Sequence, residues 1–187
     1  PRARNAYKRA NPPVMRSTIF MTMVLSSLCA MVGTVQAQPE ALVLPINGRV
    51  SDGDHKLEGC SVLTYKGNDL IGNQVTDRSG RFGMVLGLGE EFAIEFRKEG
   101  FLPKRILVDT KGELPKDLLE IAPIEMAMNM LPSSKYEGAD TDELDFPFAI
   151  VKYDRGAKAF IQDQQYTADM MRTNGALLLM SGRAGKQ

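Results

Sequence analysis

The sequence predicts a mainly β protein, a seven-stranded immunoglobulin- or transthyretin-like β-sandwich followed by a C-terminal extension. Short apolar segments alternate with polar residues and are separated by turn residues at even spacing, as in sandwiches. A tight corner is expected from Asp77 to Gly80, because Asp accepts backbone hydrogen bonds in turns and Gly tolerates the positive φ that closes many of them. From residue 157 the apolar spacing changes to three and four, which indicates one face of a helix.

The first 37 residues are expected to lie outside the folded domain. Residues 1–14 precede Met15, the predicted translation start, and are interpreted as upstream or cloning-derived residues. Residues 15–37 have a basic start, an apolar stretch and small residues at Val35 and Ala37, which predicts a secretory signal peptide cleaved after Ala37. The alternative is a retained membrane anchor, because residues 17–37 are uncharged and long enough to span a bilayer.

Net charge limits the kinds of partner that are expected, and cysteine content limits the disulfides. Without the first 37 residues, which hold five basic and no acidic residues, the chain carries 18 basic and 23 acidic residues, a net charge of −5. This balance argues against a nucleic-acid partner, which would need clustered Lys and Arg. Cys60 would be alone in the exported chain, so no internal disulfide is expected, and a buried thiol is favoured over a reactive one.

The β region is predicted to run from residue 41 to residue 130. Leu119 to Met130 is the last expected strand, and Pro123 should confine it to an edge or a bulge because proline donates no amide. The clearest strand places Phe92, Ile94 and Phe96 between the two sheets, with Phe82 packing near them. The opposite face of that strand is expected to be wet and carries Glu91, Ala93, Glu95 and Arg97. The other expected strands are Leu42–Val50, Cys60–Tyr65, Leu70–Val75, Phe82–Leu86 and a strand opened by Ile106 and Val108.

Four segments in this order resemble the carboxypeptidase regulatory-like domain. They are residues 46–50, 57–62, 76–82 and 96–101, and the resemblance covers roughly Leu44 to Met128. It implies a transthyretin-like, immunoglobulin-like sandwich of about seven strands that serves as a non-catalytic accessory or envelope module. It implies no catalytic residues.

The remainder of the chain is divided into an acidic linker at 131–145 and an extension at 146–187 that contains an amphipathic helix. Asp140, Asp142, Glu143 and Asp145 lack the Gly and Glu positions of a calcium loop, so the linker is expected to be solvated. Phe146 to Tyr153 is a predicted short strand. The helix is expected to pack on the sandwich or, alternatively, to dock on an envelope partner, and a stop is expected near Asn174-Gly175. Its predicted apolar face is Ile161, Gln164, Ala168, Met171, Gly175 and Leu178.

No catalytic, cofactor-binding or metal-binding residue is predicted, and no cofactor. His55 is the only histidine and lies in a charged turn, which favours a surface residue over a ligand. Ser79 lacks the sequence context of a hydrolase nucleophile. Paired carboxylates such as Glu90 and Glu91 flank a strand and are interpreted as solubilising charges.

The function expected from the sequence is a non-catalytic, exported structural or interaction module of the bacterial periplasm or cell envelope, with a protein partner. The alternative is a carbohydrate-binding accessory module with a glycan partner. That alternative is weakened because the chain has no Trp and its tyrosines, among them Tyr65, Tyr136, Tyr153 and Tyr166, are scattered. A membrane is an expected partner only if the N-terminal segment is retained.

Overall fold

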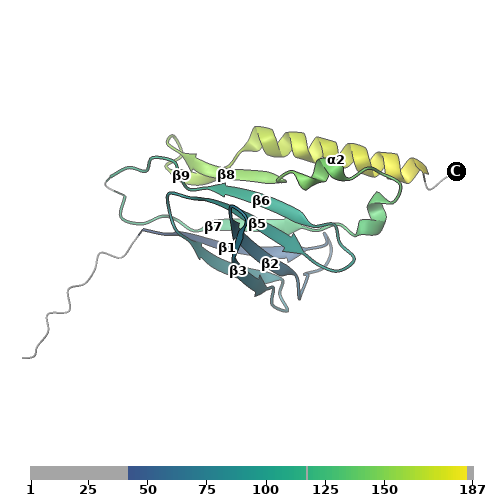
Figure 1. Ribbon diagram of the computed structural model, residues 1–187, viewed down its shortest axis with the longest axis horizontal. Coiled ribbons are helices and arrows are strands. Elements are labelled where there is room, and N and C mark those ends of the chain that lie inside the picture. The colour runs from purple at the N-terminus through teal and green to yellow at the C-terminus, as the bar shows by residue number, and fades with distance from the viewer. Residues whose placement is uncertain (1–41, 117, 185–187) are drawn as a thin grey trace, which may run out of the picture. The chain divides into compact units, whose positions relative to one another are not determined.

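The computed structural model describes residues 42–116 and 118–184, and this part of the chain forms a β-sandwich with a C-terminal helix (Figure 1). The predicted signal peptide and its cleavage site lie outside the described residues. Seven strands precede residue 130: β1 (Leu44–Ser51), β2 (Ser61–Lys66), β3 (Asp69–Val75), β4 (Arg81–Leu86), β5 (Glu91–Arg97), β6 (Lys104–Asp109) and β7 (Ile124–Asn129). The later elements are the 3-10 helices η1 (Ser133–Tyr136) and η2 (Asp142–Asp145), strands β8 (Ala149–Asp154) and β9 (Ala159–Gln162), and helix α2 (Gln164–Ala184).

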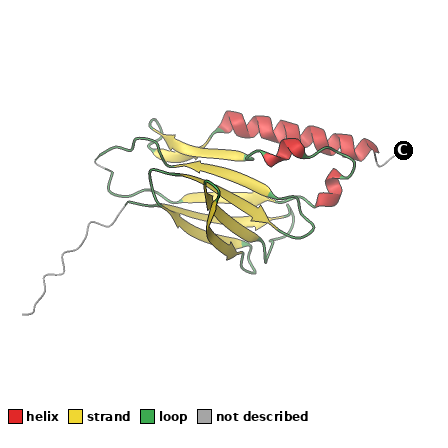
Figure 2. Cartoon of the chain, viewed as in Figure 1, coloured by secondary structure: helices red, strands yellow, loops and turns green. Residues whose placement is uncertain are grey.

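The strands form two sheets of unequal width (Figure 2). The smaller sheet has the order β4-β1-β7, and the larger has the order β3-β2-β5-β6-β8-β9. Strands β1 and β7 are parallel, as are β6 and β8, and the other neighbours are antiparallel. The C-terminal extension therefore contributes two strands to the larger sheet, and the smaller sheet has no counterpart to them among the described residues.

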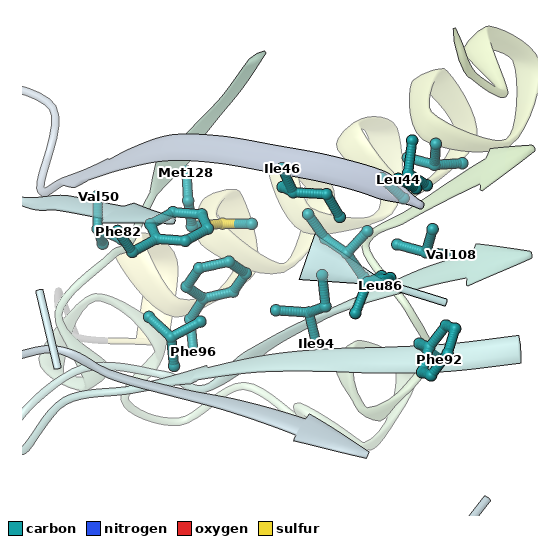
Figure 3. Close-up of a cluster of buried hydrophobic side chains, with 14 of the residues drawn as sticks. Leu44, Ile46, Val50, Phe82, Leu86, Phe92, Ile94, Phe96, Val108 and Met128 are labelled. Carbon is teal, nitrogen blue, oxygen red and sulfur yellow. The ribbon is translucent and has the colours of Figure 1, made fainter. Parts of the chain in front are cut away.

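The core between the sheets follows the period-2 pattern of the sequence. Phe92, Ile94 and Phe96 are buried, as predicted, together with alternate residues of β1 and β4 (Figure 3). The rings of Phe82 and Phe96 meet edge to face with centroids 5.3 Å apart. This geometry suits the positive edge and negative face of two aromatic rings. The core prediction is confirmed.

The corner between β3 and β4 is the turn that the sequence predicted. One carboxylate oxygen of Asp77 accepts the amides of Ser79 at 2.7 Å and Arg81 at 2.8 Å. Gly80 has a φ of +70°, and its carbonyl accepts the amide of Val50 at 2.8 Å. A Cβ at Gly80 would lie 2.3 Å from the Val50 carbonyl oxygen, so this contact between strands β1 and β4 requires glycine.

One charged residue on the predicted wet face of β5 is in fact buried. Glu95 is 5% exposed, on the outer face of the larger sheet. Its carboxylate accepts two hydrogen bonds from Arg97, at 2.8 and 3.1 Å, and Arg105 lies 3.8 Å away. The two guanidinium groups cover and neutralise the carboxylate, which is how a charged group becomes compatible with burial.

The change of periodicity predicted at residue 157 occurs later in the structure. Residues 159–162 form β9, an antiparallel partner of β8, and the helix begins at Gln164. The helix also continues through Asn174 and Gly175, where a stop was expected. Ile161, which was assigned to the helix face, therefore lies in β9. Tyr153 of β8 and Phe160 of β9 pack edge to face with centroids 5.4 Å apart and help to hold this strand pair together.

The predicted apolar face of the helix is wrong, because a different set of residues around the helix axis is buried. Met171 was placed on that face but is 56% exposed, whereas Thr167, Leu177 and Ser181 are buried. The hydroxyl groups of Thr167 and Ser181 donate to main-chain carbonyls, which removes the cost of burying them. A buried stripe that contains hydroxyl residues cannot be located from hydrophobic spacing alone. No helix among the described residues has the length and apolarity needed to cross a membrane.

The stretch predicted as an acidic linker contains η1 and η2. Tyr136 of η1 is buried, and its hydroxyl donates to the side-chain oxygen of Asn174 in α2. Ser181 of α2 donates to the carbonyl of Lys135 at 2.6 Å. Two hydrogen bonds therefore join η1 to the helix.

Candidate functional site

The difference in width between the two sheets leaves a groove beside strand β7. The groove has a volume of about 590 Å³, and we call it the β7 groove. Its residues come from β6, β7, β8, β9 and α2, with Phe148 and Leu131 at one end. A volume of this size falls within the range of roughly 300–1,000 Å³ typical of ligand pockets.

The floor of the β7 groove is the inner face of the larger sheet. Ile106, Ala149, Val151 and Phe160 line it, and all four belong to the same hydrophobic cluster as the core between the sheets. They lie at alternate positions of β6, β8 and β9, so their side chains point to one face of the sheet. The core surface therefore continues past the edge of the smaller sheet as an apolar floor.

The wall of the groove is the outer edge of β7. The amide of Met130 donates to the carbonyl of Ser51, so at this end of β7 the backbone groups of even-numbered residues face β1. Backbone direction alternates along a strand, so the amides and carbonyls of Glu125, Ala127 and Asn129 face away from β1. The register of β1 and β7 is unbroken from residue 124 to residue 129, which carries this alternation along the whole strand. No strand of the described residues pairs with that outer edge.

Helix α2 forms the opposite wall. Met171 and Asn174 both line the groove, and the exposure of Met171 is explained by this position. At the end of β7 the chain passes through Leu131 into η1, and the bond from Tyr136 to Asn174 joins η1 to the helix. We call this end of the groove, where η1 connects β7 to α2, its closed end.

Lys104 is the cation at the closed end of the groove. It is 9% exposed, and its ammonium group lies 4.2 Å from the centre of the Phe148 ring. Its Nζ donates to the outward-facing carbonyl of Asn129. Burial lowers the pKa of Lys104 from 10.5 to about 8, so the group is still charged at pH 7. No ion pair among the described residues includes Lys104.

The residues that the sequence singled out for chemistry lie away from the groove. His55 is exposed and lies 3.5 Å from Asp52, and Ser79 belongs to the corner of strand β4. Cys60 is buried, and burial raises the pKa of its thiol, which disfavours the reactive thiolate. In the described part of the chain, no three His, Cys, Asp or Glu side chains gather as a metal site would need.

The tyrosines that a carbohydrate site would need do not form an exposed platform. Tyr136 is buried, and Tyr65, Tyr153 and Tyr166 are partly buried. The hydroxyl of Tyr166 donates to the carbonyl of Pro147 at 2.7 Å, which ties the helix to the loop before β8. These rings come from separate elements, and none of the four is fully exposed.

Neither Lys104 nor the groove was predicted from the sequence. One signal was present: Lys104 stands at the same period-2 positions as Ile106 and Val108, so alternation alone would have placed its ammonium on the buried face of β6. The groove itself depends on β8 and β9 extending only the larger sheet, which follows from tertiary pairing.

Comparisons with known proteins show a distant similarity to β-sandwich domains. No family model matches the chain, and no curated protein matches it. A 3-chlorocatechol 1,2-dioxygenase from Rhodococcus opacus 1CP is 12% identical with a TM-score of 0.38, over 52% of this chain and 62% of that one. A DUF3823 family protein from Parabacteroides merdae is 19% identical with a TM-score of 0.36, over 50% and 48%. The pilus 2b backbone protein of group B streptococcus is 10% identical with a TM-score of 0.32, over 47% and 40%.

The matched region spans less than two thirds of each of these three proteins. At such identities and TM-scores the similarity concerns the sandwich architecture and carries no argument about activity.

Proposed function

We propose that this protein is a non-catalytic interaction module of the bacterial cell envelope that binds an extended segment of a partner protein in the β7 groove. The observation that carries the proposal is the juxtaposition of an unpaired strand edge with an apolar floor. Glu125 and Ala127 offer outward-facing amides and carbonyls, and the floor beside them can receive apolar side chains. Strand addition of this kind takes affinity from the main chain and specificity from alternate side chains.

The position of α2 favours a single extended segment over the sheet edge of a second copy. An exposed edge normally invites pairing with any other edge, and proteins protect edges by covering them. Here the helix stands opposite β7 across the groove, and the space between them is about 590 Å³. A strand of six residues, the length of β7, matches this site, whereas a second sandwich would meet the helix.

The envelope location and the absence of catalysis belong to the same proposal. Support for export comes from the signal-peptide pattern at residues 15–37. The carboxypeptidase regulatory-like resemblance agrees with seven strands between Leu44 and Asn129, and we propose membership of that family on this basis. N-terminal sequencing of the protein from an envelope fraction should give Gln38. A chain that still carries Met15 and resists carbonate extraction would contradict cleavage.

The strand-addition proposal is tested by changing one edge amide. Ala127→Pro removes an amide that faces the groove and leaves the hydrogen bonds between β1 and β7 in place, because proline is tolerated where its nitrogen faces outward from an edge strand. Ala127→Ser is the matched control, since it keeps the amide at the same exposed position. The probe is a synthetic library of hexapeptides with Val, Ile, Leu or Phe alternating with Thr.

The wild type and Ala127→Ser are expected to retain library members to a similar extent, whereas Ala127→Pro should retain at least about tenfold fewer. Thermal unfolding of the three proteins checks that folding is unchanged. Equal retention by a folded Ala127→Pro variant, or no retention by the wild type, would overturn strand addition.

A further inference from the structure

The closed end of the β7 groove carries a positive charge that no acidic side chain among the described residues balances. A lysine ammonium has three hydrogen-bond donors, and in Lys104 one of them is used by the carbonyl of Asn129. The face of the Phe148 ring supports the cation from another side. In the described residues no carboxylate lies within ion-pair distance, and burial alone accounts for the lowered pKa. Buried charges are usually paired with an opposite charge, so an anion bound beside Lys104 would supply the missing partner.

The surroundings of Lys104 place that anion at the end of the occupant's chain. Lys104, Phe148 and Asn174 line the end of the groove where η1 connects β7 to α2. An extended segment that lies along β7 cannot continue past this connection. Asn174 accepts the Tyr136 hydroxyl with its side-chain oxygen, so its amide nitrogen remains a donor on a residue that lines the groove together with Lys104. A cation and an amide donor at this end of the groove are suited to a carboxylate, because charge-assisted hydrogen bonds from lysine to a carboxylate are strong. Capture of a C-terminal carboxylate is an established mode of peptide recognition.

We infer that the β7 groove recognises the free C-terminus of its partner, with the terminal carboxylate bound by Lys104 and the preceding residues paired along β7. This inference rests on the function proposed above. It also fixes direction: the bound segment runs parallel to β7, because β7 ends at the side of the groove where Lys104 lies. Membrane lipids and internal loops of proteins are excluded as occupants, since neither brings a chain-terminal carboxylate on an extended backbone.

The experiment compares two versions of the hexapeptide library, one with free C-terminal carboxylates and one with C-terminal amides. A third version is amidated and carries one internal Glu, which separates a terminal carboxylate from a side-chain carboxylate. The proteins are the wild type and Lys104→Met, which removes the charge at similar side-chain length. Lys104→Gln replaces it if Lys104→Met does not fold, as judged by thermal unfolding.

The wild type should retain the free-acid library about tenfold more than either amidated library, the size of one charge-assisted hydrogen bond. Lys104→Met should retain all three equally. Equal retention of acids and amides by the wild type would overturn C-terminal recognition, and strand addition would still stand if Ala127→Pro abolished that retention. Stronger retention of the internal-Glu library would also overturn it, by assigning the carboxylate to a side chain.

Discussion

Replacing Lys104 with methionine should stabilise the protein, because the ammonium group is buried and forms no ion pair within residues 42–116 and 118–184. Burial lowers the pKa of Lys104 from 10.5 to about 8. A difference of this size between the unfolded and folded states corresponds to roughly 3 kcal/mol against folding while the lysine is charged. Loss of the Asn129 hydrogen bond and of the contact with Phe148 offsets about half of this. We therefore expect a gain of roughly 1–3 kcal/mol at pH 7.

The pH dependence distinguishes this cause from better packing. Below pH 8 Lys104 is charged in both the folded and the unfolded state, so the stability of the wild type is lowered by the full free energy of burying the charge. Between pH 8 and 10.5 the folded state has lost this proton and the unfolded state has not, so the stability of the wild type rises relative to the variant. Above 10.5 both are neutral and the cost vanishes. The other titratable groups are common to both proteins, so their contributions cancel in a comparison of two proteins that differ only at Lys104.

The assay is urea unfolding of both proteins at pH 7 and pH 10, with Lys152→Met as the control. Lys152 is exposed and lies 2.8 Å from Asp163, which raises the pKa of this lysine, so its removal should bring no gain. An advantage of Lys104→Met that stays constant between the two pH values would refute the reasoning. A loss of stability at pH 7 would refute it as well.

Two further predictions concern the fold. Gly80→Ala should lower the free energy of unfolding by roughly 2 kcal/mol or more, because φ is +70° and the new Cβ would meet the Val50 carbonyl. A change under about 0.5 kcal/mol in urea unfolding would contradict this prediction. Leu177→Asp should lower the free energy of unfolding by at least about 2 kcal/mol, because Leu177 is only 8% exposed. Met171→Asp should change it by less than about 0.5 kcal/mol, because Met171 is 56% exposed. Thermal unfolding that ranks the two variants the other way would contradict the observed helix face.

Local rules predicted the sandwich well. Strands β1, β4 and β5 were found because one face of each is apolar or glycine at every second residue. The Asp77–Gly80 corner was found because its chemistry is contained in four consecutive residues. The edge position predicted for the last strand is observed, since β7 has no outer partner in the described part of the sheet. The strand is shorter than the predicted Leu119–Met130, because it begins at Ile124, immediately after Pro123.

The features that sequence reasoning missed depend on partners far away in the chain. Glu95 can be buried because Arg97 and also Arg105 of the next strand neutralise its carboxylate. Of these two partners only Arg97 is close to Glu95 in the sequence, so the local pattern did not predict the burial. The helix face was misplaced because Ser181 is buried against the carbonyl of Lys135, 46 residues earlier. The groove requires β8 to pair with β6 and α2 to face β7. These are contacts between distant parts of the chain, so no local sequence pattern could predict the groove.

The central claim is that the outer edge of β7 receives a strand. Amide hydrogen exchange followed by NMR, with and without a hexapeptide selected from the library, tests it most directly. The amides of Glu125 and Ala127 should exchange more slowly when the peptide is bound, whereas that of Met128, which already faces β1, should change little. Unchanged exchange at Glu125 and Ala127 in the peptide-bound protein would contradict the account.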